Sequence, residues 1–113
     1  MELEDQRLMK PDVERRQYRR IKLVTQVHCE SLDRNEVMVT RDVSLGGMFI
    51  NVRFPLPIDS ELALNFRLYP TEPAITCRGV VMFSRIGLGM GIQFLNISEE
   101  AKQTLQKFVD EGA

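Results

Sequence analysis

Six short runs of strand-forming residues, separated by turn residues, constrain the fold of this chain most strongly. The clearest run covers residues 61–68, where Leu62, Leu64 and Phe66 alternate with polar or small side chains. An alternation of period two predicts a strand with one buried face. The six expected strands cover residues 21–30, 36–41, 48–53, 61–68, 74–85 and 90–95.

One amphipathic helix is expected after the last strand, over residues 98–109. Ser98 can cap its first turn, and the two glutamates that follow suit the positive end of the helix dipole. Apolar residues then recur at helical spacing, namely Ala101, Leu105, Phe108 and Val109. Short strands with closely spaced turns and one terminal helix predict an all-β fold. It is an antiparallel barrel or a strongly curled sheet, with the helix closing an end or a side. Gly79, inside the fifth strand, is a candidate for a bulge or a bend.

Length and composition limit the class of protein. A chain of 113 residues is expected to form one domain. No apolar run approaches the about 18 residues of a membrane span, and the acidic N-terminus is unlike a signal peptide, so we expect a cytoplasmic protein. Cys29 and Cys77 lie far apart and the sequence has one histidine, His28. A metal site is therefore not expected, and the cysteines are interpreted as buried thiols.

A polar, glycine-rich turn lies between the second and third expected strands. It reads Asp42-Val43-Ser44-Leu45-Gly46-Gly47 and is called the Asp42–Gly47 corner below. Two interpretations are open. In the first it is a hairpin turn, in which Asp and Ser bond to their own backbone and glycine supplies the turn geometry. In the second it is a binding corner, because glycines let a ligand approach the backbone while Asp42 and Ser44 supply hydrogen-bonding groups.

Positive charge is concentrated just ahead of the first expected strand. Residues 10–22 carry six basic and two acidic side chains, a net charge of +4, so the remainder of this chain of net charge −1 carries −5. Residues 14–20, Glu-Arg-Arg-Gln-Tyr-Arg-Arg, form the densest part and are called the arginine arm below. A concentrated basic segment next to a polar corner suits an anionic ligand.

With the arm and the corner both in view, the sequence resembles the PilZ domain family. The family signature is an RxxxR element before the first strand, followed by a [D/N]xSxxG element. Here the first runs from Arg16 to Arg20 and is extended by Arg15, and the second is Asp42-x-Ser44-x-x-Gly47. The strand Met-Gly-Ile-Gln-Phe at 90–94 is also of a kind frequent in the family. Together the motifs are far more specific than either alone.

The resemblance covers residues 14–109 and implies a six-stranded antiparallel β-barrel that binds the bacterial second messenger cyclic di-GMP. We accordingly expect a flexible N-terminal lead-in over residues 1–13 and one PilZ-like domain over 14–110, helix included. No cofactor is implied. The signal would pass to an effector protein of motility, pilus, biofilm or exopolysaccharide machinery, with the receptor a monomer or a homodimer.

By the same resemblance, six residues are expected to bind the ligand. Their chemistry suits cyclic di-GMP, because guanidinium groups offer forked donors to phosphate and guanine and a flat face for stacking. Arg16 and Arg20 would grip phosphate and guanine with help from Arg15, Asp42 would accept from guanine N1 and N2, Ser44 would hydrogen-bond, and Gly47 would leave room. Tyr18 could either stack on a base or pack on the barrel. Arg19 stands where the family often has proline and is assigned no contact.

Other classes of function are weighed beside this one. A PilZ-like adaptor that binds no nucleotide would be expected to lack the arginines and the corner, and this chain has both. A small barrel that binds single-stranded nucleic acid is disfavoured, because the positive charge is confined to one run without interleaved aromatic residues. An enzyme is not expected, since the sequence shows no nucleophile–base pair, metal set or GxxxxGK[ST] loop.

Overall fold

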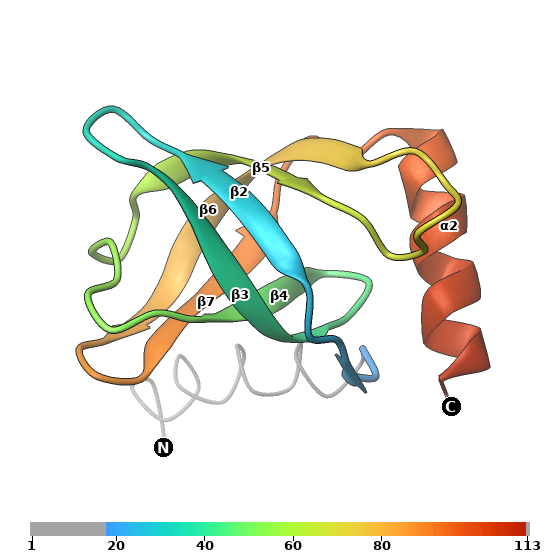
Figure 1. Ribbon diagram of the computed structural model, residues 1–113, viewed down its shortest axis with the longest axis horizontal. Coiled ribbons are helices and arrows are strands. Elements are labelled where there is room, and N and C mark those ends of the chain that lie inside the picture. Colours follow the sequence, from blue (N-terminus) through green and yellow to red (C-terminus); the bar gives the residue numbers. More distant parts are fainter. Residues whose placement is uncertain (1–17, 113) are drawn as a thin grey trace, which may run out of the picture.

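The computed structural model describes residues 18–112, shown as a coloured ribbon in Figure 1. These residues form a strongly curved antiparallel sheet and a C-terminal helix. The elements are β1 (Ile21–Lys22), β2 (Gln26–Glu30), β3 (Asn35–Val43), β4 (Gly47–Asn51), β5 (Glu61–Phe66), β6 (Ile75–Arg85), β7 (Gly89–Phe94) and α2 (Glu99–Glu111).

Six of the strands close into a barrel because β3 pairs on both of its edges. The hydrogen-bonded order runs β3-β2-β5-β6-β7-β4, and β4 pairs with β3 again. Every pairing is antiparallel. The two-residue strand β1 adds to the last residues of β3, outside the ring. The expected closed six-stranded barrel with one C-terminal helix is confirmed.

The barrel interior is filled by the inward side chains of all six strands. Its largest fully buried members include Phe66, Met48, Ile50 and Met90, and Phe66 stacks on Phe94 with ring centroids 6.0 Å apart. Burial of this much apolar surface is the main stabilising contribution to such a fold.

Both cysteines lie in this core, as expected from the sequence. Burial raises the pKa of Cys29 to about 12 and that of Cys77 to about 11. The nearby Glu36 carboxylate adds to the effect at Cys29. The thiols therefore stay protonated near neutral pH. His28, the residue next to Cys29, points to the exposed side of β2.

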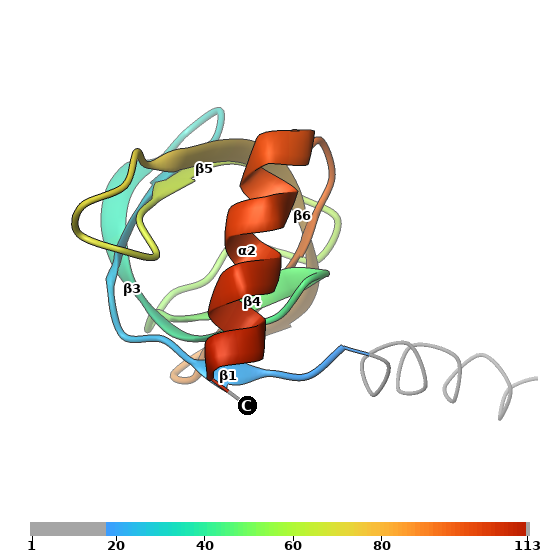
Figure 2. The ribbon, with the colours of Figure 1, turned by 90° about the vertical axis from the view of Figure 1, so that its right-hand side faces the viewer.

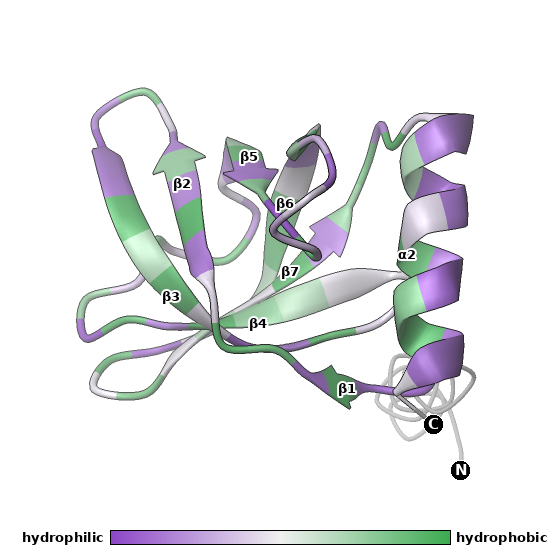
Figure 3. Cartoon of the chain, turned by 45° about the vertical axis from the view of Figure 1, so that its right-hand side comes forward, coloured by the Kyte–Doolittle hydropathy of each residue, from purple (hydrophilic) through white to green (hydrophobic). Residues whose placement is uncertain are grey.

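Helix α2 covers one open end of the barrel (Figure 2). It begins after Ser98, whose Oγ accepts a 3.0 Å hydrogen bond from the Ala101 amide, which confirms the expected cap. Leu105 and Val109 are buried, and Figure 3 shows the apolar side of the helix turned toward the barrel. The helix covers the end of the barrel with the apolar residues that the helical spacing in the sequence predicts.

The loop between β5 and β6 holds the helix from outside. The Tyr69 ring meets Phe108 edge-on at 5.7 Å, and its hydroxyl donates a 2.6 Å hydrogen bond to Glu111. That hydrogen bond raises the pKa of Tyr69 to about 12. Lys107 adds a 3.2 Å ion pair to Glu72. The C-terminal half of α2 is thus attached to the barrel by apolar and polar contacts together.

Two strand predictions need correction. The expected strand over residues 21–30 is broken into β1 and β2, because the buried Thr40 hydroxyl bonds to the backbone between them. The bulge expected at Gly79 lies instead between Val81 and Phe83. Gly79 serves close packing, since a Cβ there would lie 2.4 Å from Ile92 Cγ2.

The Thr40 hydroxyl should stabilise the fold, because it bonds to two backbone groups between β1 and β2. Its Oγ1 accepts from the Thr25 amide at 3.0 Å and donates to the Leu23 carbonyl. Thr40→Val removes the bridge and leaves both backbone groups unpaired, so we expect a loss of about 1–3 kcal/mol in the free energy of unfolding, measured in urea. The control Thr76→Val removes an exposed hydroxyl that bonds to Asn65. Equal stabilities of the two variants would contradict the bridging role.

Gly47 should be required by the closure of the barrel. A Cβ at this position would lie 1.9 Å from the Ile92 carbonyl oxygen on the neighbouring strand β7. Gly47→Ala should therefore cost about 1–3 kcal/mol or more in the same urea experiment, because backbone must move to admit the methyl group. Gly46→Ala is the matched control, since its Cβ would meet the movable Tyr18 ring at 3.1 Å. The expectation fails if the Gly46 variant is the less stable one.

Candidate functional site

A bulge in β3 determines where the Asp42 side chain points. Thr40 pairs with Ile50 and Asp42 pairs with Phe49, so Arg41 is an extra residue on the β3 side. Thr40 is fully buried, and strict alternation would turn Asp42 toward the core. The bulge instead leaves Arg41 and Asp42 together on the outer surface, and Val43 returns to the interior.

The Asp42 carboxylate binds two arginines. Oδ1 accepts from Arg20 at 2.7 Å (Nη2) and 2.9 Å (Nε), and Oδ2 accepts from Arg41 Nε at 2.9 Å. The Asp42 side chain is only 15% exposed, against 34% for Arg20 and 49% for Arg41. The result is a charge-assisted cluster at the surface, in which a largely buried acceptor lies between two more accessible cationic groups.

Ser44 stabilises the turn at the corner. Its amide donates to the Gly47 carbonyl at 2.8 Å, while its Oγ accepts from the Gly46 amide at 3.2 Å and donates to Gly47 O at 3.4 Å. Ser44 lies beyond the end of β3 and is 2% exposed. The hairpin-turn interpretation therefore describes Ser44, whereas Asp42 bonds to arginines rather than to its own backbone.

The two glycines of the corner have different neighbours. Gly46 lies under the Tyr18 ring, which packs over the turn, and its carbonyl accepts a 2.9 Å bond from the Phe94 amide. Gly47 faces the backbone of β7, as described above. Its missing side chain thus has a packing reason that is independent of any ligand.

The structure brings four of the six expected site residues into one corner: Arg20, Asp42, Ser44 and Gly47. Arg15 and Arg16 lie outside the described residues. Arg19 is exposed.

Sequence reasoning missed one neighbour of this cluster. The Arg41 guanidinium carbon lies 3.9 Å above the centroid of the Phe49 ring, and Phe49 lies 6.0 Å from Phe83 across Gly91. These side chains form a row on the outer surface, from Arg41 across β4 and β7 to β6. The signal was hidden because the bulge that aligns Arg41 with Asp42 leaves no mark in the residue pattern.

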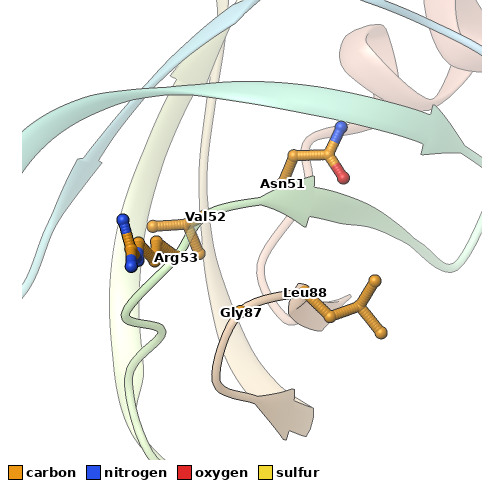
Figure 4. Close-up of a pocket in the computed structure, with 5 residues that line it drawn as sticks. All are labelled: Asn51, Val52, Arg53, Gly87 and Leu88. Atoms are coloured by element: carbon orange, nitrogen blue, oxygen red, sulfur yellow. The ribbon is translucent and has the colours of Figure 1, made fainter.

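A pocket elsewhere on the barrel lacks this chemistry. It measures about 750 Å³ and is lined by Asn51, Val52, Arg53, Gly87 and Leu88 (Figure 4). Asn51 is at the far end of β4 from the corner. Among residues 18–112, no three metal-binding side chains gather at one place, and no helix has the length and apolarity to cross a membrane. The cluster around Asp42 is therefore the candidate site.

Solved structures with the same fold support a comparison. Bacillus subtilis inhibitor of motility, MotI/DgrA, matches with a TM-score of 0.71 and 20% identity over 84% of this chain and 49% of its own. The PilZ domain of Escherichia coli YcgR with c-di-GMP gives 0.69 and 18%, over 87% and 91%. Borreliella burgdorferi PlzA in complex with c-di-GMP gives 0.66 and 14%, over 91% and 45%. The chain thus spans about half of the MotI/DgrA and PlzA chains.

A search of curated proteins finds no match. The sequence profile of the PilZ domain matches residues 14–111, which include the arm, the corner and the helix. The order of the motifs, the closed barrel and this match agree. The chain belongs to the PilZ domain family.

Proposed function

We propose that this protein is a reversible receptor for cyclic di-GMP, which it binds between the arginine arm and the Asp42–Gly47 corner. The observation that carries the proposal is the pairing of Arg20 with Asp42 on the outer surface of the barrel, at the positions of the two family motifs. That two similar structures are described as complexes with c-di-GMP supports the choice of ligand.

The ligand has a direct chemical match in these groups. Cyclic di-GMP presents two phosphates and two guanines, and the forked donors of Arg20 fit a phosphate or the O6 and N7 atoms of guanine. The Asp42 carboxylate is a suitable acceptor for guanine N1 and N2. Because both of its oxygens are already bonded to arginine, the ligand would exchange with at least one of these contacts.

The other expected residues have narrower roles in this proposal. Arg15 and Arg16 would bind phosphate or guanine from the arm as it closes over the ligand. Ser44 already uses its donor and one acceptor lone pair inside the turn, so it has one lone pair left for the ligand. Gly47 would leave room beside the turn in addition to allowing β4 to approach β7.

A path from the site to a partner surface starts at β1. Ile21 follows Arg20 directly and pairs with Val43. Its side chain packs on the end of α2, since a Cβ at Gly112 would lie 2.5 Å from Ile21 Cγ2. Displacing Arg20 would therefore change the contact between β1 and the C-terminal end of α2. We propose that an effector protein recognises this altered surface.

One observation favours a second candidate, a PilZ adaptor that binds no nucleotide. The Asp42 carboxylate is paired with two arginines without any ligand, so its hydrogen bonds are also satisfied if the corner is only a structural element. The two candidates differ in a single measurable property, the binding of cyclic di-GMP.

Calorimetric titration of cyclic di-GMP separates these candidates. We expect saturable binding with a Kd near the micromolar range, about −8 kcal/mol, and clear weakening by added salt. Arg16→Ala, Arg20→Ala and Asp42→Ala should each weaken binding by about tenfold or more, because each removes a charge-assisted contact worth about 1.5–3 kcal/mol. GTP and a short single-stranded oligonucleotide serve as competitors.

Arg85→Ala is the control, because Arg85 is an exposed arginine at the end of β6. It should bind as the wild type does. Absence of binding by folded wild-type protein at high micromolar ligand would reject the receptor function and support the adaptor. Preference for the oligonucleotide would support a nucleic-acid-binding barrel instead.

Hydrogen exchange tests the proposed path to the partner surface. Cyclic di-GMP should change the exchange rates of amides in β1 and in the last turn of α2, while β5 stays unchanged. Ile21→Ala removes the contact with Gly112. It should keep most of the binding heat but lose the response of α2. A response of α2 that persists in this variant would contradict the path.

A further inference from the structure

Arg41 is held in a defined position on the outer surface by two contacts. Its guanidinium carbon lies 3.9 Å above the Phe49 ring centroid, a geometry typical of a cation–π contact. Its Nε donates a 2.9 Å hydrogen bond to Asp42 Oδ2. The bulge in β3 makes both contacts possible, because it places Arg41 on the same side of the sheet as Asp42 and Phe49.

The same position leaves part of the guanidinium available. One face rests on Phe49, which is only 7% exposed, whereas the Arg41 side chain itself is 49% exposed. Among the side-chain hydrogen bonds of residues 18–112, the Arg41 guanidinium contributes only its Nε. The opposite face and both Nη groups therefore have the chemistry to bind a planar, electron-rich and anionic ligand beside Asp42.

We propose that Arg41 is a further ligand-contacting residue, whose free face stacks on a guanine base of cyclic di-GMP. This inference rests on the proposed function. The order of the stack is Phe49, Arg41, guanine, with Asp42 at the edge of the guanidinium. Because Phe49 and Asp42 already fix the guanidinium, binding costs little side-chain entropy at this residue.

A matched surface arginine makes the test specific. Arg78 on β6 is 50% exposed and pairs with Glu61 at 3.3 Å, so it resembles Arg41 in exposure and in having a carboxylate partner. Arg41→Ala should raise the Kd for cyclic di-GMP by about tenfold, because it removes the surface on which one base would stack. Arg41→Lys should not restore affinity, because lysine keeps the charge but has no planar face. Arg78→Ala should bind as the wild type does.

Direct contact is distinguished from an effect through Asp42 by NMR. In the wild-type complex, we expect an intermolecular NOE between the δ-methylene protons of Arg41 and guanine H8. If Arg41→Ala weakens binding but the wild-type complex shows no such NOE, Arg41 is a positioning residue for Asp42, and the proposed ligand contact is overturned. Unchanged affinity of Arg41→Ala, together with loss of binding in Arg20→Ala, would overturn this inference alone. No binding by the folded wild type would reject the proposed function and this inference together.

Discussion

The pairing of β3 on both of its edges is the constraint on which this structure depends. β3 closes the barrel by bonding to β2 on one side and to β4 on the other, and its last residues also pair with β1. Closing a sheet into a barrel requires its strands to tilt and curve, and the extra residue at Arg41 bends β3 where it pairs with β4. The bulge that bends β3 within the closed barrel therefore also turns Asp42 outward. Fold and site share one cause.

Much of the fold was predictable because it rests on local patterns. Alternating burial marks β5, helical spacing marks Leu105 and Val109 on α2, and Ser98 caps that helix as its chemistry favours. The exceptions depend on long-range contacts. The break between β1 and β2 follows from a hydroxyl on Thr40, 15 residues from Thr25, and no pattern within residues 21–30 carries that information.

The candidate site was predictable by its motifs but not by its geometry. The motifs select Arg20, Asp42 and the turn, and the structure places them together. The motifs do not identify Arg41. A one-residue bulge changes the face of the sheet on which the following side chains lie, and its position depends on the pairing with the partner strand β4. The two glycines show the same limit. Gly46 and Gly47 are adjacent in one motif, yet Gly46 faces the Tyr18 ring and Gly47 faces the backbone of β7.

The electrostatics of the corner suit a reversible sensor better than a tight binder. In the free protein the Asp42 carboxylate has charge-assisted bonds to Arg20 and Arg41, so a ligand that takes either arginine or the carboxylate gives up contacts of similar strength. The net free energy of binding the proposed ligand would then be a difference between comparable terms, so we expect a moderate affinity. The Arg20 and Arg41 side chains remain partly exposed, so ionic screening acts on the exchange. An arginine already bonded at the site also keeps the Asp42 carboxylate hydrogen-bonded when the ligand leaves.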